Sequence, residues 1–350
     1  MEFWQRVHWF VTSGCNQKCK FCFKPDFKPG NGKNIENLAE IISENKVKEV
    51  IFTGGEPLLA EGLYSGLKIL HNNKVDISLH TNGTLLENFD YSLVNEIAVP
   101  LDSMDEEMQD YLRGVKHFQN IKKAFEQLQD KKLRIGIHTV ATDLNISGIH
   151  KIYSFLKNKR FDYWRIYEYN FDLANKFGSL KNYQDALMLK GNAASEDDGG
   201  VNDLLAEFLL MEEKMGKYND KRVQFVGVRD YSREPYFFLN SLGEIYFSSW
   251  FSQGKRTFIG NVFDEGFKDV RRKIIKAHEK GIGYDLESFV ERMNDMPLWA
   301  RAAWEGNYFS EELWEINPRY NKRFLHLSEL YLGRLKKQGE APKDAEPAFD

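Results

Sequence analysis

The chain has 350 residues, of which 42% are hydrophobic and 29% charged, and its formal net charge is −4. This composition excludes a disordered or collagen-like chain, and the acidic balance argues against bulk nucleic acid as the main partner. No run reaches the roughly 18 uncharged apolar residues of a membrane span, and the first residues do not read as a signal peptide. The sequence therefore predicts a globular protein without a membrane span.

The three cysteines all lie between positions 15 and 22, and no cysteine follows Cys22. An odd number of cysteines this close together cannot form a disulfide framework. Reduced thiols are normal in the cytoplasm, so a cytoplasmic location is expected.

Predicted strands alternate with predicted helices over the first 170 residues. The strands are expected at 7–12, 48–53, 76–80, 97–101, 133–142 and 163–169, and the helices at 37–45, 63–72, 121–129 and 148–157. This alternation predicts an α/β fold, a partial (β/α)6 TIM-like barrel of parallel strands with helices outside. On such a scaffold, the loops at the carboxyl ends of the strands carry the chemistry.

The remainder of the chain breaks this rhythm. We expect the barrel to occupy residues 1–222, with a helical and loop excursion at about 171–222 that includes an acidic, glycine-bearing stretch. Residues 223–338 are expected to form a C-terminal β-hairpin, with strands at 236–240 and 244–249, and a helical extension. A disordered tail is expected at 339–350.

Cys15, Cys19 and Cys22 have the spacing CxxxCxxC in one short loop after the first predicted strand. Three thiolates in one loop can converge on a soft metal centre, and they suit an iron–sulfur cluster with one iron left without a protein ligand. A zinc-binding structural loop is an alternative, although zinc usually takes four protein ligands in structural sites. A disulfide redox pair would need only two cysteines.

Four motifs together resemble those of the radical S-adenosylmethionine (radical SAM) enzymes. The cysteine motif with Phe21 before its last cysteine is the first, and Thr53-Gly54-Gly55-Glu56-Pro57 is similar to the family's GGEP segment. Thr81-Asn82-Gly83 follows the third predicted strand, and the segment from Leu101 to Gly114 is similar to the family's LDSxD…LRG pattern. The resemblance covers about residues 5 to 170.

This resemblance implies the cofactors and the residues that hold them. Cys15, Cys19 and Cys22 would bind three irons of a 4Fe-4S cluster, and the fourth iron would be chelated by S-adenosylmethionine. Gly54, Gly55, Glu56 and Pro57 would form part of the S-adenosylmethionine site, with the Glu56 carboxylate facing the ammonium group. Asn82 and Ser103 would contact its ribose or carboxylate groups.

The strand pattern also predicts polar residues inside the barrel. Ile135 and Ile137 alternate with His138, so the histidine points inward if the isoleucines face the outer helices. The same argument places Ser78 and His80 inside, and Arg165 is a further candidate. Such an interior favours a polar, anionic substrate, although these residues could also serve structural hydrogen bonds.

Two branches of the family compete as models for the substrate. The segment from Tyr236 to Gly266 is similar to SPASM-type enzymes that modify peptides, but serines stand at 248 and 249 near the expected cysteine position. The single cluster motif, the Cys22-Phe23 pair and the LDSMDEE segment are similar to viperin-type enzymes, which act on nucleotides.

The expected function is reductive cleavage of S-adenosylmethionine to methionine and a 5′-deoxyadenosyl radical, which takes hydrogen from a polar, nucleotide-like small molecule. The alternatives are a peptide-modifying enzyme without an auxiliary cluster and, in another class, a non-catalytic iron–sulfur redox sensor. The enzyme reading implies a small-molecule or peptide substrate and an electron donor such as flavodoxin or ferredoxin.

Overall fold

The protein is seen in a computed structural model that describes residues 3–22, 34–142, 144–168, 215, 218–226, 236–248 and 257–279. All of these residues belong to one compact unit, which spans 1–227 and 234–284. A second unit, 228–233 and 285–350, lies outside the described residues. So do the predicted tail at 339–350, the helical extension beyond residue 279, and nearly all of the 171–222 excursion.

Ten strands form a single sheet in the order β10-β9-β8-β1-β2-β3-β4-β5-β6-β7. Strands β1 to β7 are parallel neighbours, β8 adds in parallel to the other side of β1, and β8, β9 and β10 are antiparallel. Among the described strands the sheet is not closed, because β7 and β10 are its two edges. The strands are β1 (Arg6–Thr12), β2 (Glu49–Gly54), β3 (Asp76–His80), β4 (Glu96–Pro100), β5 (Arg134–Ala141), β6 (Tyr163–Glu168), β7 (Val223–Val226), β8 (Tyr236–Asn240), β9 (Glu244–Ser248) and β10 (Thr257–Asn261).

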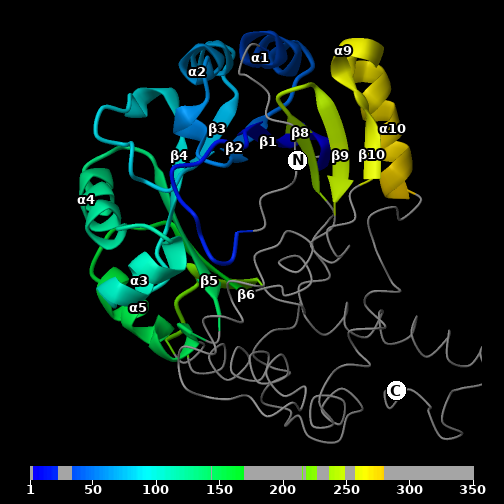
Figure 1. Ribbon diagram of the computed structural model, residues 1–350. Helices are drawn as coiled ribbons and strands as arrows, with labels where there is room; N and C mark the ends of the chain where they lie inside the picture. The colour runs from blue at the N-terminus through cyan, green and yellow to red at the C-terminus, as the bar shows by residue number, and fades with distance from the viewer. Residues whose placement is uncertain are drawn as a thin grey trace, which may run out of the picture. The chain divides into compact units, whose positions relative to one another are not determined.

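Helices cover one face of this curved sheet. Figure 1 shows α1, α2, α4 and α5 following one another around the outside of the strands, with the β8–β9 hairpin beside β1. None of the described helices is long and apolar enough to span a membrane. The helices are α1 (Ile35–Glu44), α2 (Leu63–Asn72), α3 (Glu106–Arg113), α4 (Phe118–Gln129), α5 (Ile149–Leu156), α9 (Val262–Glu265) and α10 (Phe267–Glu279).

The core lies between the sheet and these helices. In α1, Ile35, Leu38, Ala39 and Ile42 are buried, and their three- and four-residue spacing places them on one helix face. Alternate strand residues point to the same side, where each is at most 1% exposed: Val7, Trp9, Val50, Phe52, Ile77, Leu79, Ile97, Val99, Ile135, Ile137, Trp164 and Ile166. The intervening residues must therefore face the inside of the barrel.

The predicted partial barrel of parallel strands with outer helices is confirmed. Helix α3 was not expected, because its sequence EEMQDYLR is mostly polar and lacks an apolar repeat. Its ends are nevertheless encoded: the Asp105 side chain accepts a hydrogen bond from the Met108 amide, and Gly114 ends the helix in the left-handed conformation. The sheet continues across the predicted domain boundary at 222, since β7 pairs with β6, and that boundary stays a prediction.

Candidate functional site

The cysteine loop follows β1 and is held by the end of β2. The amides of Gly55 and Glu56 donate hydrogen bonds of 2.7 Å to the carbonyl oxygens of Thr12 and Gly14. A side chain at position 55 would place its Cβ atom 2.0 Å from the Gly14 oxygen, so only glycine permits this contact. The loop thus enters the site in a position fixed by the GGEP segment.

A second segment holds the loop from the other side. The Lys18 amide donates to the Arg113 carbonyl (3.2 Å), and the Lys20 amide donates to the Leu112 carbonyl (2.9 Å). Gly114 has φ of +68°, and a Cβ atom there would lie 2.3 Å from the Lys18 oxygen. The LRG motif therefore docks the cysteine loop through its backbone.

Glu56 accepts hydrogen bonds from the protein with both carboxylate oxygens, and its expected contact with an ammonium group stays a prediction. The side chain is fully buried, and Oε1 accepts hydrogen bonds from the Leu58 amide (3.1 Å) and the Thr81 hydroxyl (2.7 Å). Oε2 accepts from the Asn82 amide (2.7 Å). Burial raises the pKa of Glu56, and these three hydrogen bonds act in the opposite direction. The carboxylate joins the end of β2 to the end of β3.

Asn82 and Ser103 are likewise engaged within the protein. The side-chain nitrogen of Asn82, Nδ2, donates to the Asn16 side-chain oxygen in the cysteine loop (2.6 Å). The Asn82 side-chain oxygen accepts from the Thr84 hydroxyl (2.7 Å). The Ser103 hydroxyl accepts from the Asp105 amide (3.0 Å) at the start of α3. Gly55, Glu56, Asn82 and the LRG segment form the frame around the cysteine loop, Gly54 is opposite Thr12 in register, and Pro57 is buried. Their contact with S-adenosylmethionine stays a prediction.

The loop offers donor atoms that suit an iron–sulfur cluster. Cys15 and Cys19 are half-buried and Cys22 is exposed, and all three are free thiols. The Gln17 side chain lies beside Cys19: its oxygen is 3.5 Å from the Cys19 sulfur, and its buried Nε2 has no hydrogen-bond partner within the described part of the chain. A buried N–H without a partner is costly unless a bound group accepts from it, as cluster sulfur atoms can.

No three His, Cys, Asp or Glu side chains of the described residues are arranged around a single metal ion. The cysteine ligands of a four-iron cube bind separate irons, so they need not gather as closely as the ligands of one ion. The three thiols therefore fit a cluster in number and in donor type.

The inner face of the sheet brings together the three residues predicted for the substrate pocket. The rings of His80 on β3 and His138 on β5 meet edge to face, with centroids 4.8 Å apart. Arg165 on β6 is opposite His138 in register, and its guanidinium lies 4.2 Å from the centre of the Tyr163 ring. Arg165 also donates to the Gln224 side chain (3.1 Å) and forms no ion pair with a carboxylate of the described residues.

His8 on β1 is an inner-face residue that the sequence analysis missed. The sequence pattern could have placed it there, because Val7, Trp9 and Val11 are apolar and His8 alternates with them. Burial lowers the pKa of His8 to about 3, and the charges of His80, Arg6 and Arg165 add to the effect. Burial also lowers the pKa of His80 to about 4, with Glu96 opposing and Arg165 adding to it. Both imidazoles are therefore neutral near pH 7.

Below these residues, Glu96 organises a network at the start of β4. Its Oε1 accepts hydrogen bonds from the hydroxyls of Ser78 and Tyr163, both at 2.7 Å, and its Oε2 pairs with Arg134 at 3.0 Å. These bonds lower the pKa of Glu96 despite the opposing effect of burial. This carboxylate is committed to the protein, and Arg165, which donates to Gln224, makes no ion pair with it.

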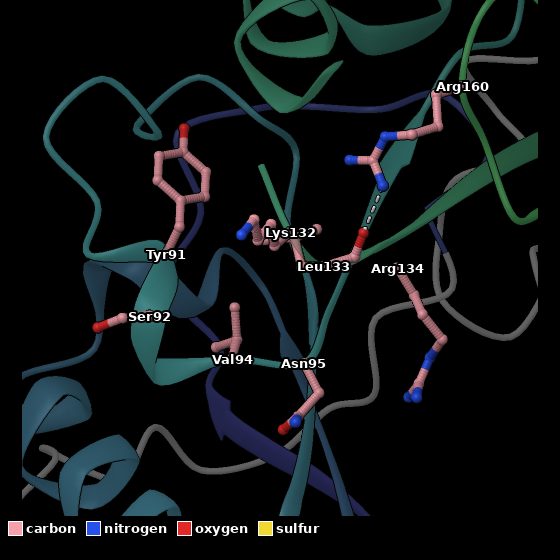
Figure 2. Close-up of a pocket in the computed structure, with 8 residues that line it drawn as sticks. All are labelled: Tyr91, Ser92, Val94, Asn95, Lys132, Leu133, Arg134 and Arg160. Atoms are coloured by element: carbon pink, nitrogen blue, oxygen red, sulfur yellow. Dashed lines mark hydrogen bonds between the residues drawn. The ribbon is translucent and has the colours of Figure 1, made fainter. Parts of the chain in front are cut away.

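A hollow of about 470 Å³ lies at the opposite end of the strands, away from the cysteine loop. Its lining includes residues that precede or begin β4 and β5 (Figure 2). Two of its three cations are engaged: Arg134 pairs with Asp76 and Glu96, and Arg160 donates to backbone carbonyls that include that of Leu133. We therefore assign the chemistry to the cysteine end, where TIM-like scaffolds carry it.

Known proteins resemble this chain in sequence and in fold. The model of the radical SAM superfamily matches residues 9–156. A S-adenosylmethionine-dependent nucleotide dehydratase of a Fibrobacter species is 26% identical over 262 residues, covering 69% of this chain and 76% of that protein. A cysteine-type anaerobic sulfatase-maturating enzyme of Clostridium perfringens is 30% identical over 230 residues, covering 53% of this chain and 61% of the relative.

Solved structures share the fold at low identity. Those of anSMEcpe with bound AdoMet include one with a TM-score of 0.57 and 18% identity, covering 85% of this chain and 87% of that one. Streptococcus suis SuiB bound to precursor peptide SuiA also has a TM-score of 0.57, at 18% identity, covering 76% and 64% of the two chains. The chain spans less than two thirds of the length of several such proteins, SuiB and the maturating enzyme among them. Residues 9–156 therefore form a radical SAM domain.

Proposed function

We propose that this enzyme uses one 4Fe-4S cluster to cleave S-adenosylmethionine reductively and acts on a polar, anionic small molecule of nucleotide-like chemistry inside the barrel. The observation that carries the substrate class is the Arg165 guanidinium, which faces the barrel interior without a carboxylate partner among the described residues. A half-buried guanidinium of this kind favours an anion. The named activity of the Fibrobacter relative, a nucleotide dehydratase, supports the same class.

Cys15, Cys19 and Cys22 would hold the cluster and leave one iron for the amino and carboxylate groups of S-adenosylmethionine. When bound, the cluster would supply the electron that breaks a carbon–sulfur bond of S-adenosylmethionine, giving methionine and a 5′-deoxyadenosyl radical that takes hydrogen from the substrate. The chain's contribution is position: the loop is fixed by Gly55 and Glu56 on one side and by the LRG segment on the other.

The barrel residues would bind and orient the substrate. Arg165 would pair with its anionic group, and the neutral His80 imidazole can donate one hydrogen bond and accept another. The Nε2 atom of His80 is buried and has no partner within the described ranges, so a ligand atom would satisfy it. His138 lies against His80 and would line the same space.

The first test addresses the cofactor. Anaerobically reconstituted protein with dithionite and S-adenosylmethionine should release 5′-deoxyadenosine, and Cys19→Ala should lose iron, sulfide and this activity. The fold of that variant should survive, because the loop lies outside the sheet. Retained iron, sulfide and cleavage in Cys19→Ala would refute the ligand assignment.

The second test addresses the substrate class. We expect one or more of the four ribonucleoside triphosphates to increase 5′-deoxyadenosine release, and Arg165→Gln to raise KM for it at least tenfold with iron content unchanged. Lys132→Gln makes the same charge change in the hollow at the other end of the strands (Figure 2) and should leave KM as in the wild type. Equal KM values for the two variants would remove the anion-pocket argument.

A peptide-modifying enzyme without an auxiliary cluster is the second candidate. The 30% identity to a sulfatase-maturating enzyme and the hairpin that extends the sheet beside β1 support it. A short precursor peptide encoded by a neighbouring gene, and its modification by the purified protein, would favour this candidate over the first. In both cases, an electron donor such as flavodoxin or ferredoxin would serve the cluster, and we place the reaction in the reducing cytoplasm.

A further inference from the structure

A buried ion pair lies against one of the three cysteines. The Arg113 guanidinium donates from Nε to Asp102 Oδ2 (2.7 Å), and its Nη2 lies 2.5 Å from the same oxygen. Its remaining arm, Nη1, lies 3.7 Å from the Cys19 sulfur. The Arg113 side chain is 10% exposed and that of Asp102 is fully buried.

The pair cannot easily turn away from the loop. The other oxygen of Asp102 accepts a hydrogen bond from the Val140 amide of β5 (2.9 Å), which ties the carboxylate to the sheet. The Arg113 guanidinium also lies 5.0 Å from the centre of the Phe21 ring in the cysteine loop. The contacts with Asp102 and with the Phe21 ring hold the plane of the Arg113 guanidinium in place. The guanidinium is therefore preorganised toward Cys19.

We propose that Arg113 is a positioning residue that raises the reduction potential of the cluster through its charge and its hydrogen bond to the Cys19 sulfur. Reduction adds one electron from an external donor and makes the cluster more negative, and no bond to the protein needs to form or break. A nearby buried cation stabilises the reduced form, and hydrogen bonds to cluster sulfur act in the same direction. Asp102 opposes this effect with its negative charge while holding the guanidinium in place.

This inference rests on the proposed function only in that Cys19 binds an iron of the cluster. Arg113 also has a structural role, because its backbone carbonyl accepts a hydrogen bond from the Lys18 amide. A purely structural role predicts that any substitution in the pair loosens the loop and changes the cluster in one direction. An electrostatic role predicts opposite directions for the loss of the cation and the loss of the anion.

The experiment is a redox titration of the reconstituted cluster, followed by electron paramagnetic resonance, without S-adenosylmethionine or substrate. Four variants are compared with the wild type: Arg113→Gln, Arg113→Lys, Asp102→Asn and Lys116→Gln. We expect the midpoint potential to shift to a more negative value in Arg113→Gln and to a more positive value in Asp102→Asn. Arg113→Lys should lie nearer the wild type than Arg113→Gln does. Lys116 is an exposed cation close by in the sequence, so its loss should leave the potential unchanged.

Equal potentials for Arg113→Gln and Lys116→Gln, or shifts of the same sign for Arg113→Gln and Asp102→Asn, would overturn the inference. If Arg113→Gln fails to assemble a cluster, the test compares Asp102→Asn with the double variant that carries both Asp102→Asn and Arg113→Gln. The inference requires the double variant to have the more negative midpoint potential. A wild-type protein that assembles no cluster would instead refute the proposed function itself, and the inference with it.

Discussion

Two histidines on the inner face of the sheet are neutral near pH 7 because they are partly withdrawn from water. The pKa of His8 falls to about 3 and that of His80 to about 4, both from an ordinary value of 6.5. An imidazole with a lowered pKa binds fewer protons in the folded protein than in the unfolded chain. The folded state therefore loses stability as the pH falls below 6.5, and the loss continues to about pH 4 for His80 and about pH 3 for His8.

The resulting prediction is a pH-dependent free energy of unfolding. Each of the two histidines should add a slope of about 1 kcal/mol per pH unit between pH 6 and 4.5, with stability higher at the higher pH. His80→Gln removes one titrating group and should reduce the slope by about that amount, and a double variant with His8→Gln by about twice it. Urea unfolding at several pH values measures the slope. An unchanged slope in His80→Gln would show that this imidazole is already charged in the folded protein.

At the scale of a single element, β5 contains a glycine that makes room for a side chain on the inner face of the sheet. A Cβ atom at Gly136 would lie 2.4 Å from the Tyr163 ring on the neighbouring strand β6. The ring lies across this gap and its hydroxyl reaches Glu96 at 2.7 Å. The missing side chain on β5 therefore makes room for the Tyr163–Glu96 bond.

Gly136→Ala should force the Tyr163 ring to move and break its bond to Glu96. We expect a loss of about 1–3 kcal/mol in the free energy of unfolding, the usual range for overpacking a filled site. The matched control is Gly148→Ala at the start of α5, where an added Cβ atom meets nothing within 4 Å and no left-handed backbone is required. Thermal unfolding of both variants tests this, and equal effects would mean that the Tyr163 contact contributes nothing.

Over the whole molecule, the parallel sheet with outer helices could be predicted because the outward strand residues are apolar and alternate with polar ones. His80 and His138 followed from the alternation of apolar and polar strand residues, Arg165 was a further candidate without an assigned strand phase, and the structure brings all three onto one face. His8 obeys the same pattern but was not assigned. The pairing of β8 with β1 could not be predicted, because the pattern of a strand does not specify which distant strand it joins.

The motifs that form the frame around the cysteine loop could be recognised in the sequence. The contacts that these motifs make with the loop could not be predicted from it. The position of Gly55 in GGEP suggested close approach of a ligand, whereas the backbone that approaches it is that of Gly14. The Glu56 carboxylate suggested an ammonium partner, which stays a prediction, but not the two amides and the hydroxyl of the chain that also donate to its oxygens. Sequence shows that a special backbone or a carboxylate is needed at a position, but not which group it faces.

We expect the sheet to fold without the last residues of the chain. Strands β8 to β10 and helix α10 lie before residue 284, and their buried residues, such as Phe237, Ile245 and Ile274, belong to the core. A fragment of residues 1–284 should therefore bind iron like the full chain and unfold within about 4 °C of it, which corresponds to about 1 kcal/mol in a domain of this size.

A shorter fragment, residues 1–227, is the contrasting case. It lacks β8, so the edge of β1 next to the cysteine loop would lose its parallel partner and expose its backbone groups. We expect this fragment to aggregate or to lose cooperative unfolding and iron binding, as measured by calorimetry and iron content after anaerobic reconstitution. If 1–227 unfolds cooperatively with its iron retained, or if 1–284 does not, β8 to α10 are not the boundary of the folding unit that holds the cluster.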